Sequence, residues 1–214
     1  MSVISKPSRL PLFPLNTVVF PGGRLPLRIF EQRYLDMVKQ AIADNTPFGI
    51  CAPLWGTPEG TPPLRGGPSA AIHEGTGTGT PHAVGTRVRV TDWDMPETGI
   101  LHIDTQAEER FVIRSTDTEP GGLIVGSVEA VSSEATTAVP DELELAVEIL
   151  RHIVSEYGDT HFPAPHEFDN AVWVGYRLSE VLPLKLSIKQ SLLEMNDSVM
   201  RVRILTEFLK KQIN

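Results

Sequence analysis

A proline-rich segment near the start of the chain constrains the fold more than any other feature of the sequence. From Leu10 to Tyr34 it reads LPLFPLNTVVFPGGRLPLRIFEQRY, with prolines at positions 11, 14, 21 and 26. Each proline fixes φ and removes a backbone donor, so a helix is excluded over most of this segment. We expect short extended pieces broken by turns, with a turn at Pro21-Gly22-Gly23 before the next strand. Helical periodicity begins only at Phe30.

This segment resembles the opening of the amino-terminal domain of Lon proteases, whose usual pattern is LPLFPL…V.FPG…PL.IFE.RY..M, here ending at Met37. One departure is Gln32, which stands where the family commonly has proline. We expect the motif residues to shape the fold and to touch no ligand; they are Pro14, Pro21, Gly22, Pro26, Phe30, Glu31, Arg33 and Tyr34.

Composition narrows the class of protein. A chain of 214 residues can bury a substantial core as one large domain or two small ones. Cys51 is the one cysteine, so no disulfide framework forms, and without a secretory leader pattern we expect a reduced, cytoplasmic protein. The apolar run from Leu10 to Phe20 is cut by prolines, so it does not predict a membrane span. The net charge of -8 offers no basic field for non-specific nucleic-acid binding.

The first part of the chain predicts β-structure with one helix. Four residues lie at helical spacing and should form an apolar stripe on one helix, namely Phe30, Tyr34, Val38 and Ile42. An apolar strand is expected at 47–52. From Pro53 to Pro81, 13 of 29 residues are Gly or Pro, which predicts a long loop or partly disordered insertion. A β-meander follows, with expected strands at 83–95, 100–106, 111–117 and 123–131 and turns at 96–99, near 108–109 and at 120–122.

The alternation in this meander predicts which residues share a face. If Met95 pairs with Ile100, one face is apolar and belongs to the core. Its members are Val88, Val90, Leu101 and Ile103; the other face holds Arg87, Arg89, Thr91, Trp93, His102 and Asp104. We expect the second face to meet solvent or a partner.

From Pro140 onward, apolar residues at helical spacing predict a helical bundle. Expected caps are boxes at Asp141 to Glu144 and at Ser187 to Gln190, and a single cap at Asp197. A helix is also expected near 168–182. Several residues here resemble the helical part of the same Lon domain, namely Leu182-Pro183-Leu184, Lys189-Gln190, Leu192-Leu193-Glu194 and Arg201. Two strings in the predicted β-region resemble strands that recur in the same Lon domain, namely Val84-Gly85-Thr86 and Arg110-Phe111-Val112-Ile113.

The resemblance implies an α+β fold, a PUA-like partly open β-barrel followed by a helical bundle. We place the barrel at 1–135, with the Gly/Pro-rich insertion at about 53–81, and the bundle at 140–214. The resemblance also implies substrate recognition without catalysis, because the ATPase and peptidase parts of Lon have no counterpart here. No Gly-x-x-x-x-Gly-Lys-Ser/Thr string occurs, so no phosphate-binding loop of that type is present.

Three further patterns resemble a serine nucleophile, a phosphate-binding loop and a metal site, but each lacks something that the site requires. Gly67-Pro68-Ser69-Ala70 resembles the string around the serine nucleophile of Lon, yet that serine needs a lysine held by a separate fold. The glycines from Gly75 to Gly79 precede a strand, so the helix amino terminus that would hold a phosphate is missing. His161 and His166 lie near Asp159 and Glu167, but the histidine spacing is not that of a zinc site, and we predict no metal and no cofactor.

The leading hypothesis is a stand-alone, non-catalytic module that binds exposed apolar segments of unfolded or partner polypeptides, an adaptor in protein quality control. Its best candidate binding residues are Leu54, Trp55, Arg89, Trp93 and His102. The alternative is RNA binding, because PUA-like folds occur in RNA-binding proteins and Arg87, Arg89, Trp93 and Arg114 mix cations with an aromatic ring. A hydrolase using Ser69 or Cys51 is the contrasting class. The resemblance leaves a homodimer open, and no membrane partner is expected.

Overall fold

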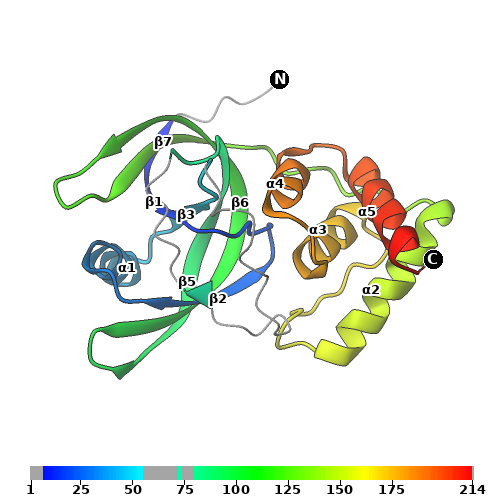
Figure 1. Ribbon diagram of the computed structural model, residues 1–214, viewed down its shortest axis with the longest axis horizontal. Coiled ribbons are helices and arrows are strands. Elements are labelled where there is room, and N and C mark those ends of the chain that lie inside the picture. The colour runs from blue at the N-terminus through cyan, green and yellow to red at the C-terminus, as the bar shows by residue number, and fades with distance from the viewer. Residues whose placement is uncertain (1–6, 55–71, 74–79, 214) are drawn as a thin grey trace. The chain divides into compact units, whose positions relative to one another are not determined.

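The computed structural model describes residues 7–54, 72–73 and 80–213. It divides into two compact units, Met1–Ser132 and Ser133–Asn214. The sequence placed this division between residues 135 and 140. The first unit is a β-barrel with one helix and the second unit is helical (Figure 1), which confirms the predicted α+β class.

The barrel unit is built on one seven-stranded sheet in the order β4-β2-β6-β5-β3-β1-β7. A further pairing of β6 with β7 closes five of these strands into a ring, from which β2 and β4 branch. This is the partly open barrel that the sequence predicted. The strands are β1 (Ser8–Pro14), β2 (Arg24–Ile29), β3 (Phe48–Cys51), β4 (Ile72–His73), β5 (Val84–Glu97), β6 (Ile100–Thr118) and β7 (Ile124–Ala130).

One long strand, β6, makes the branched closure possible. Its first half, Leu101 to Gln106, pairs with β2, and its second half, from Phe111 to Thr118, pairs with β7. The sequence predicted two strands here with a turn near Glu108-Glu109, and that prediction is wrong. The charged pair interrupts the apolar pattern without turning the chain, because Glu108 and Glu109 lie at a register shift between β5 and β6 and remain in the strand.

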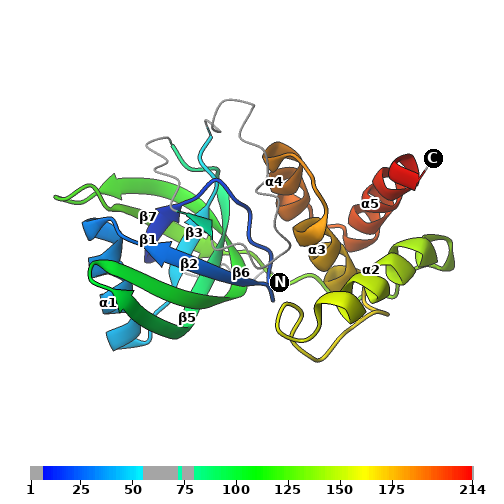
Figure 2. The ribbon, with the colours of Figure 1, turned by 60° about the horizontal axis from the view of Figure 1, so that its bottom comes forward.

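The helix α1 (Gln32–Asp44) covers the core of the barrel unit. Tyr34 is buried on this helix and its ring stacks on Phe13 with the centroids 4.1 Å apart. Val38 is also buried, as its helical spacing predicted, but Phe30 precedes the helix and is 50% exposed, so its expected place in the apolar stripe is wrong. Figures 1 and 2 show α1 between two projecting hairpins, β5–β6 and β6–β7.

The helical unit contains η1 (Asp141–Leu143), α2 (Glu144–Tyr157), α3 (Ala171–Val181), α4 (Leu186–Glu194) and α5 (Ser198–Ile213). Of the three predicted caps, Asp197 is confirmed, since its Oδ1 accepts from the N–H of Met200 at 2.9 Å. The two predicted boxes are wrong, because neither α2 nor α4 has a side-chain cap. Asp141 begins η1 and Ser187 lies within α4.

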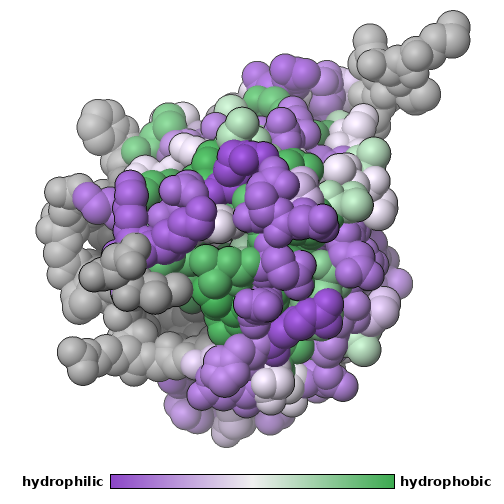
Figure 3. All heavy atoms as spheres, turned by 90° about the vertical axis from the view of Figure 1, so that its right-hand side faces the viewer, coloured by the Kyte–Doolittle hydropathy of each residue, from purple (hydrophilic) through white to green (hydrophobic). Residues whose placement is uncertain are grey.

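The surface of the helical unit is mainly polar. Figure 3 looks onto this side of the molecule, where the largest area of hydrophobic residues lies near the centre and hydrophilic residues border it. The exposed large apolar side chains of the unit are Tyr157, Ile188, Met200 and Ile204. Among the helices that the structure describes, none has both the length and the apolar character to cross a membrane.

Candidate functional site

The outer half of the β5–β6 hairpin exposes Trp93, the one tryptophan among the described residues of the barrel unit. β3 pairs with β5 only as far as Val88, and beyond that point β6 is the one described strand beside β5. Every residue from 91 to 97 is exposed. Trp93 is 56% exposed and Met95 is 41% exposed. Neighbouring exposed side chains of this size on a projecting strand suggest a binding surface.

The pairing of the hairpin places Trp93 on the core side of the sheet. Trp93 lies opposite Ile103, and directly paired residues of antiparallel strands share a face. Ile103 is buried, whereas His102 pairs with Asp94 and faces away from the core. The predicted common face for Trp93 and His102 is therefore wrong.

Two irregularities in the hairpin cause this difference. The assumed pair of Met95 with Ile100 does not form, because Glu97 pairs with Ile100 across a tight turn. Between Val90 and Asp92, β5 also holds one more residue than β6 does, which is a β-bulge. An extra residue in a strand moves the side chain of every later residue to the opposite face of the sheet. An assignment by strict alternation from Val88 therefore puts Trp93 on the wrong face.

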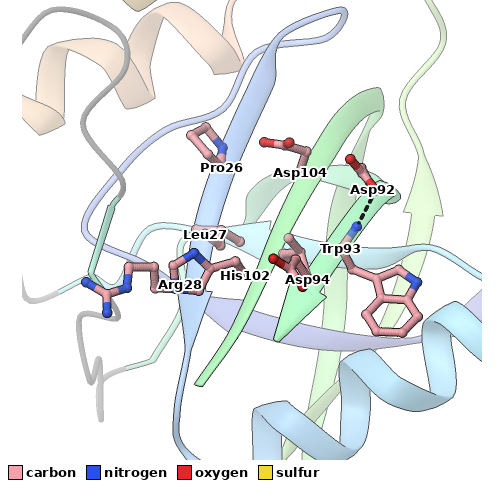
Figure 4. A pocket seen from close by; sticks show the side chains of 9 residues that line it. Pro26, Leu27, Arg28, Asp92, Trp93, Asp94, His102 and Asp104 are labelled. Atoms are coloured by element: carbon pink, nitrogen blue, oxygen red, sulfur yellow. Dashed lines mark hydrogen bonds between the residues drawn. The ribbon is translucent and has the colours of Figure 1, made fainter. Parts of the chain in front are cut away.

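The face turned away from the core holds a shallow pocket of about 180 Å³. It spans three adjacent strands and is lined by Pro26, Leu27, Arg28, Asp92, Trp93, Asp94, His102, Ile103 and Asp104. Figure 4 shows that the indole of Trp93 projects away from the other labelled side chains. The hairpin thus presents an aromatic residue on one side and an acidic pocket on the other.

The charges of this pocket favour a cationic group. Three carboxylates, Asp92, Asp94 and Asp104, line it together with one guanidinium, that of Arg28. The nearest charged partner of Arg28 is Glu97, with Nη2 and Oε1 3.9 Å apart. The lining contains no serine, threonine or cysteine, so it offers no hydroxyl or thiol nucleophile. Its carboxylates and its guanidinium can bind charged groups.

Of the five predicted binding residues, Trp93 and His102 lie on adjacent strands of the hairpin, but their side chains occupy opposite faces. His102 and Trp93 line the same pocket, from different strands. Arg89 lies outside the lining and is held by Glu108, with Nε and Oε1 2.7 Å apart. Leu54 is 50% exposed but follows the end of β3 that lies beside the start of β5, so it is remote from the hairpin turn. Trp55 lies outside the described residues.

Among the residues that the structure describes, the other chemical candidates form no assembled site. Ser69 and the glycines from Gly75 to Gly79 lie outside the described residues. Burial raises the pKa of Cys51 to about 12, which leaves its thiol protonated and unreactive at neutral pH. His161 and His166 each hydrogen-bond a backbone carbonyl, at 3.1 Å and 2.7 Å. Across the described residues, no group of three or more metal-binding side chains comes together.

The motif residues of the opening segment make contacts within the barrel unit. Arg33 pairs with Glu31, with Nη2 and Oε2 2.8 Å apart, and donates through Nη1 to the carbonyl of Gly122 at 3.0 Å. This contact ties α1 to the turn between β6 and β7. Gly22 has φ 78°, a value that favours glycine, and its N–H donates to the carbonyl of Ala107 at 3.0 Å.

The prolines of the motif stand where a strand can lack a donor. Pro14 ends β1 and is buried, Pro21 opens the turn before β2, and Pro26 lies in β2 opposite Asp104. Pro26 also lines the pocket, so it is the one residue of the motif that the structure places beside the candidate site.

Sequence reasoning missed Met95, Asp92 and Asp94. The signal was present in the sequence, since Asp-Trp-Asp-Met at 92–95 alternates acidic and apolar residues at the period of a strand. The alternation of acidic and apolar residues could be seen in the sequence. The bulge could not, and it decides whether the acidic or the apolar residues face the core.

A PUA-like barrel followed by a helical bundle is the architecture of amino-terminal domains of Lon proteases. A family model described as the ATP-dependent protease La (LON) substrate-binding domain matches residues 9–211, and the chain belongs to that family. This confirms the family resemblance read from the opening segment and the helices.

Solved structures of Lon amino-terminal domains share the fold. A Lon N-terminal domain protein from Xanthomonas campestris is 30% identical, with a TM-score of 0.69 and coverage of 92% of this chain and 96% of that one. The N-terminal domain of the Mycobacterium avium complex Lon protease is 16% identical, with a TM-score of 0.59 and coverage of 94% and 97%; at this identity it supports the fold alone.

Sequence similarity to whole proteases is confined to a short segment. Lon protease 2 of Myxococcus xanthus and the Lon protease of Anaeromyxobacter dehalogenans (strain 2CP-C) are each 42% identical over 45 residues. The match covers 21% of this chain and 5% of each protease.

Proposed function

We propose that this chain binds unfolded or partner polypeptides without catalysing a reaction on them, as an adaptor in protein quality control. The observation that carries the proposal is the projecting β5–β6 hairpin, on which Trp93 is 56% exposed and Met95 is 41% exposed. An exposed aromatic ring can anchor an apolar partner, and a flexible thioether side chain adapts to partners of different shape. Membership of a substrate-binding domain family supports the same role.

Several ion pairs weigh against the RNA-binding alternative. The arginines that suggested it each contact a glutamate: Arg87 with Glu109 at 3.2 Å, Arg89 with Glu108 at 2.7 Å and Arg114 with Glu129 at 2.6 Å. A phosphate backbone needs cations that are available to it. Trp93 also stands between two aspartates in the sequence, which would repel a polyanion.

Fluorescence anisotropy with a labelled unfolded protein tests the proposal. The probe is lysozyme that has been reduced and carboxamidomethylated, so that it cannot refold, and native lysozyme is the folded control. We expect saturable binding of the unfolded probe only. The variant Trp93→Ala should weaken it by about tenfold or more, the effect of removing a central aromatic contact.

The matched control is Tyr157→Ala, which removes an exposed aromatic ring from the helical unit and should leave the affinity unchanged. No binding of the unfolded probe by the wild-type chain would refute the proposal. Salt-dependent affinity for labelled single-stranded RNA, without affinity for the unfolded probe, would favour the alternative instead. Leu54 and Trp55 stay predictions, and their alanine variants belong in the same titration.

A further inference from the structure

The backbone groups of β5 identify an open edge on the hairpin. On β6, Ala107 exchanges backbone hydrogen bonds with Gly22 and Gly23 at the β2 side, at 3.0 Å and 2.8 Å. Because backbone groups of successive strand residues point to opposite edges, odd-numbered residues of this half of β6 bond toward β2. The even-numbered His102 and Asp104 therefore bond toward β5.

The residues of β5 that pair with His102 and Asp104 determine which way the N–H groups of Trp93 and Met95 point. Asp94 pairs with His102 and Asp92 pairs with Asp104, so both aspartates turn their backbone groups toward β6. Trp93 and Met95 alternate with them and turn their N–H groups to the other edge. The pairing with β3 ends at Val88, so in the described residues no strand occupies this edge beside Trp93 and Met95.

Each of these edge donors is capped by the carboxylate of the residue before it. The N–H of Trp93 donates to Oδ1 of Asp92 at 2.9 Å, and the N–H of Met95 donates to Oδ1 of Asp94 at 2.7 Å. The caps are local, exposed and reversible. Charges on an edge strand and a bulge within it both discourage edge-to-edge pairing, and β5 has both features.

The carboxylates of Asp92 and Asp94 favour some partner strands at this edge and disfavour others. In an antiparallel pair with a second copy of the chain, centred on Trp93, Asp92 would face Asp94 in both directions, and like charges directly opposite destabilise a strand pair. An incoming strand that carries lysine or arginine on this face gains from both carboxylates, and from Asp104 beside them in the pocket.

We propose that the polypeptide bound by this module adds as a strand along the open edge of β5, from Val90 to Glu97. Its carbonyls replace the carboxylate caps on the N–H groups of Trp93 and Met95. Alternate side chains then point to opposite faces, so the preferred segment alternates apolar residues, beside Trp93 and Met95, with basic residues, beside Asp92 and Asp94. The inference rests on the proposed function and specifies the mode and the ligand chemistry.

Backbone methylation of a peptide tests the mode of binding. The probe is fluorescein-labelled Lys-Val-Lys-Val-Lys-Val-Lys, amidated at its carboxyl end. In an added strand the N–H groups of alternate residues point toward β5 and the others point to solvent. N-methylation of the central residues of one type, lysine or valine, should therefore weaken binding by about tenfold through lost backbone bonds, and methylation of the other type should change it little.

Equal sensitivity or equal indifference of the two methylated peptides would overturn strand addition. The unfolded lysozyme titration separates this failure from failure of the proposed function, because that probe should still bind through Trp93 when only the mode is wrong. If neither the lysozyme probe nor the peptide binds, the proposed function fails and the mode with it.

Charge removal tests the ligand chemistry. Asp92→Asn with Asp94→Asn keeps an oxygen that can cap each N–H but removes two negative charges. We expect at least about fivefold weaker binding of the lysine peptide and a smaller salt dependence. Asp117→Asn with Asp169→Asn makes the same change in net charge at exposed positions elsewhere and should have little effect. Equal effects of the two double variants would reject recognition of basic residues at this edge.

Discussion

The guanidinium of Arg201 is fully buried and is held by the carboxylate of Glu134, with Nη2 and Oε1 2.7 Å apart and Nη1 and Oε2 3.2 Å apart. Arg201 also donates to the carbonyls of Leu192 at 3.0 Å and Met195 at 2.5 Å. Tyr176 completes the group, since its hydroxyl donates to Glu134 at 2.6 Å and its ring lies 4.4 Å from the guanidinium carbon. Glu134 thereby joins the start of the helical unit to α3 and α5, and Arg201 in turn holds the carbonyl of Leu192 on α4.

Loss of Glu134 should destabilise the helical unit strongly. Glu134→Ala leaves the buried charge of Arg201 without its counterion, a change that costs about 3–5 kcal/mol of unfolding free energy. Urea denaturation followed by circular dichroism measures it. Glu142→Ala is the matched control, because its pair with Arg203 is solvent-exposed and should leave the midpoint nearly unchanged. Similar midpoints for both variants would contradict this role of Glu134.

Gly85→Ala should destabilise the barrel unit by about 1–3 kcal/mol through overpacking. A Cβ at this position would lie 2.5 Å from the carbonyl oxygen of Ile50 and 2.6 Å from Cζ of Phe111. The first obstacle is backbone within a paired strand, so it cannot move aside without breaking the ladder. Thermal unfolding is the measurement, and an unchanged midpoint would show that the strand tolerates the added methyl group.

Trp93→Ala should lower the unfolding free energy by no more than about 2 kcal/mol, because more than half of the residue is exposed. Phe111→Ala, at a fully buried position, should cost about 3–5 kcal/mol. Urea denaturation of both variants checks the contrast. A large loss for Trp93→Ala would mean that the residue packs as core and would weaken its use as a binding probe.

The thiol of Cys51 should resist alkylation in the native protein. Burial raises its pKa to about 12, and the thiolate is the reactive form. At pH 8 only about one in ten thousand native molecules therefore carries Cys51 as the thiolate. In the unfolded chain the pKa of the thiol is ~8.5, so a much larger fraction is ionised. Labelling with iodoacetamide should stay slow between pH 7 and 9.5 and become rapid in urea. Equal native and unfolded rates would contradict the burial of this group.

Sequence patterns predicted the elements of the fold better than their pairing. The prolines and the Pro21-Gly22-Gly23 turn indicated the broken strands of the opening segment, because proline and glycine restrict the backbone locally. The single long strand β6 was not predictable in this way, since Glu108 and Glu109 interrupt its pattern and only the partners β2 and β7 reveal that it continues.

The candidate site was predictable in part for the same reason. Trp93 and His102 stood out as an aromatic and a titratable residue on neighbouring predicted strands. Which faces they occupy depends on an extra residue between Val90 and Asp92. That bulge was not visible in the sequence, because Thr91 stands there and not the glycine that marks some bulges. The buried pair of Glu134 and Arg201 was equally hidden, because 67 positions separate the two residues along the chain.

Hydrogen exchange of the intact chain, with and without the reduced and carboxamidomethylated lysozyme probe, tests the central claim most directly. The account predicts slower amide exchange in residues 90–97 when the probe is bound, because the N–H groups of Trp93 and Met95 become covered and bonded. Exchange over α2 and α5 should be unchanged. Saturating binding of the probe with no protection in residues 90–97 would contradict the account and place the polypeptide on another surface.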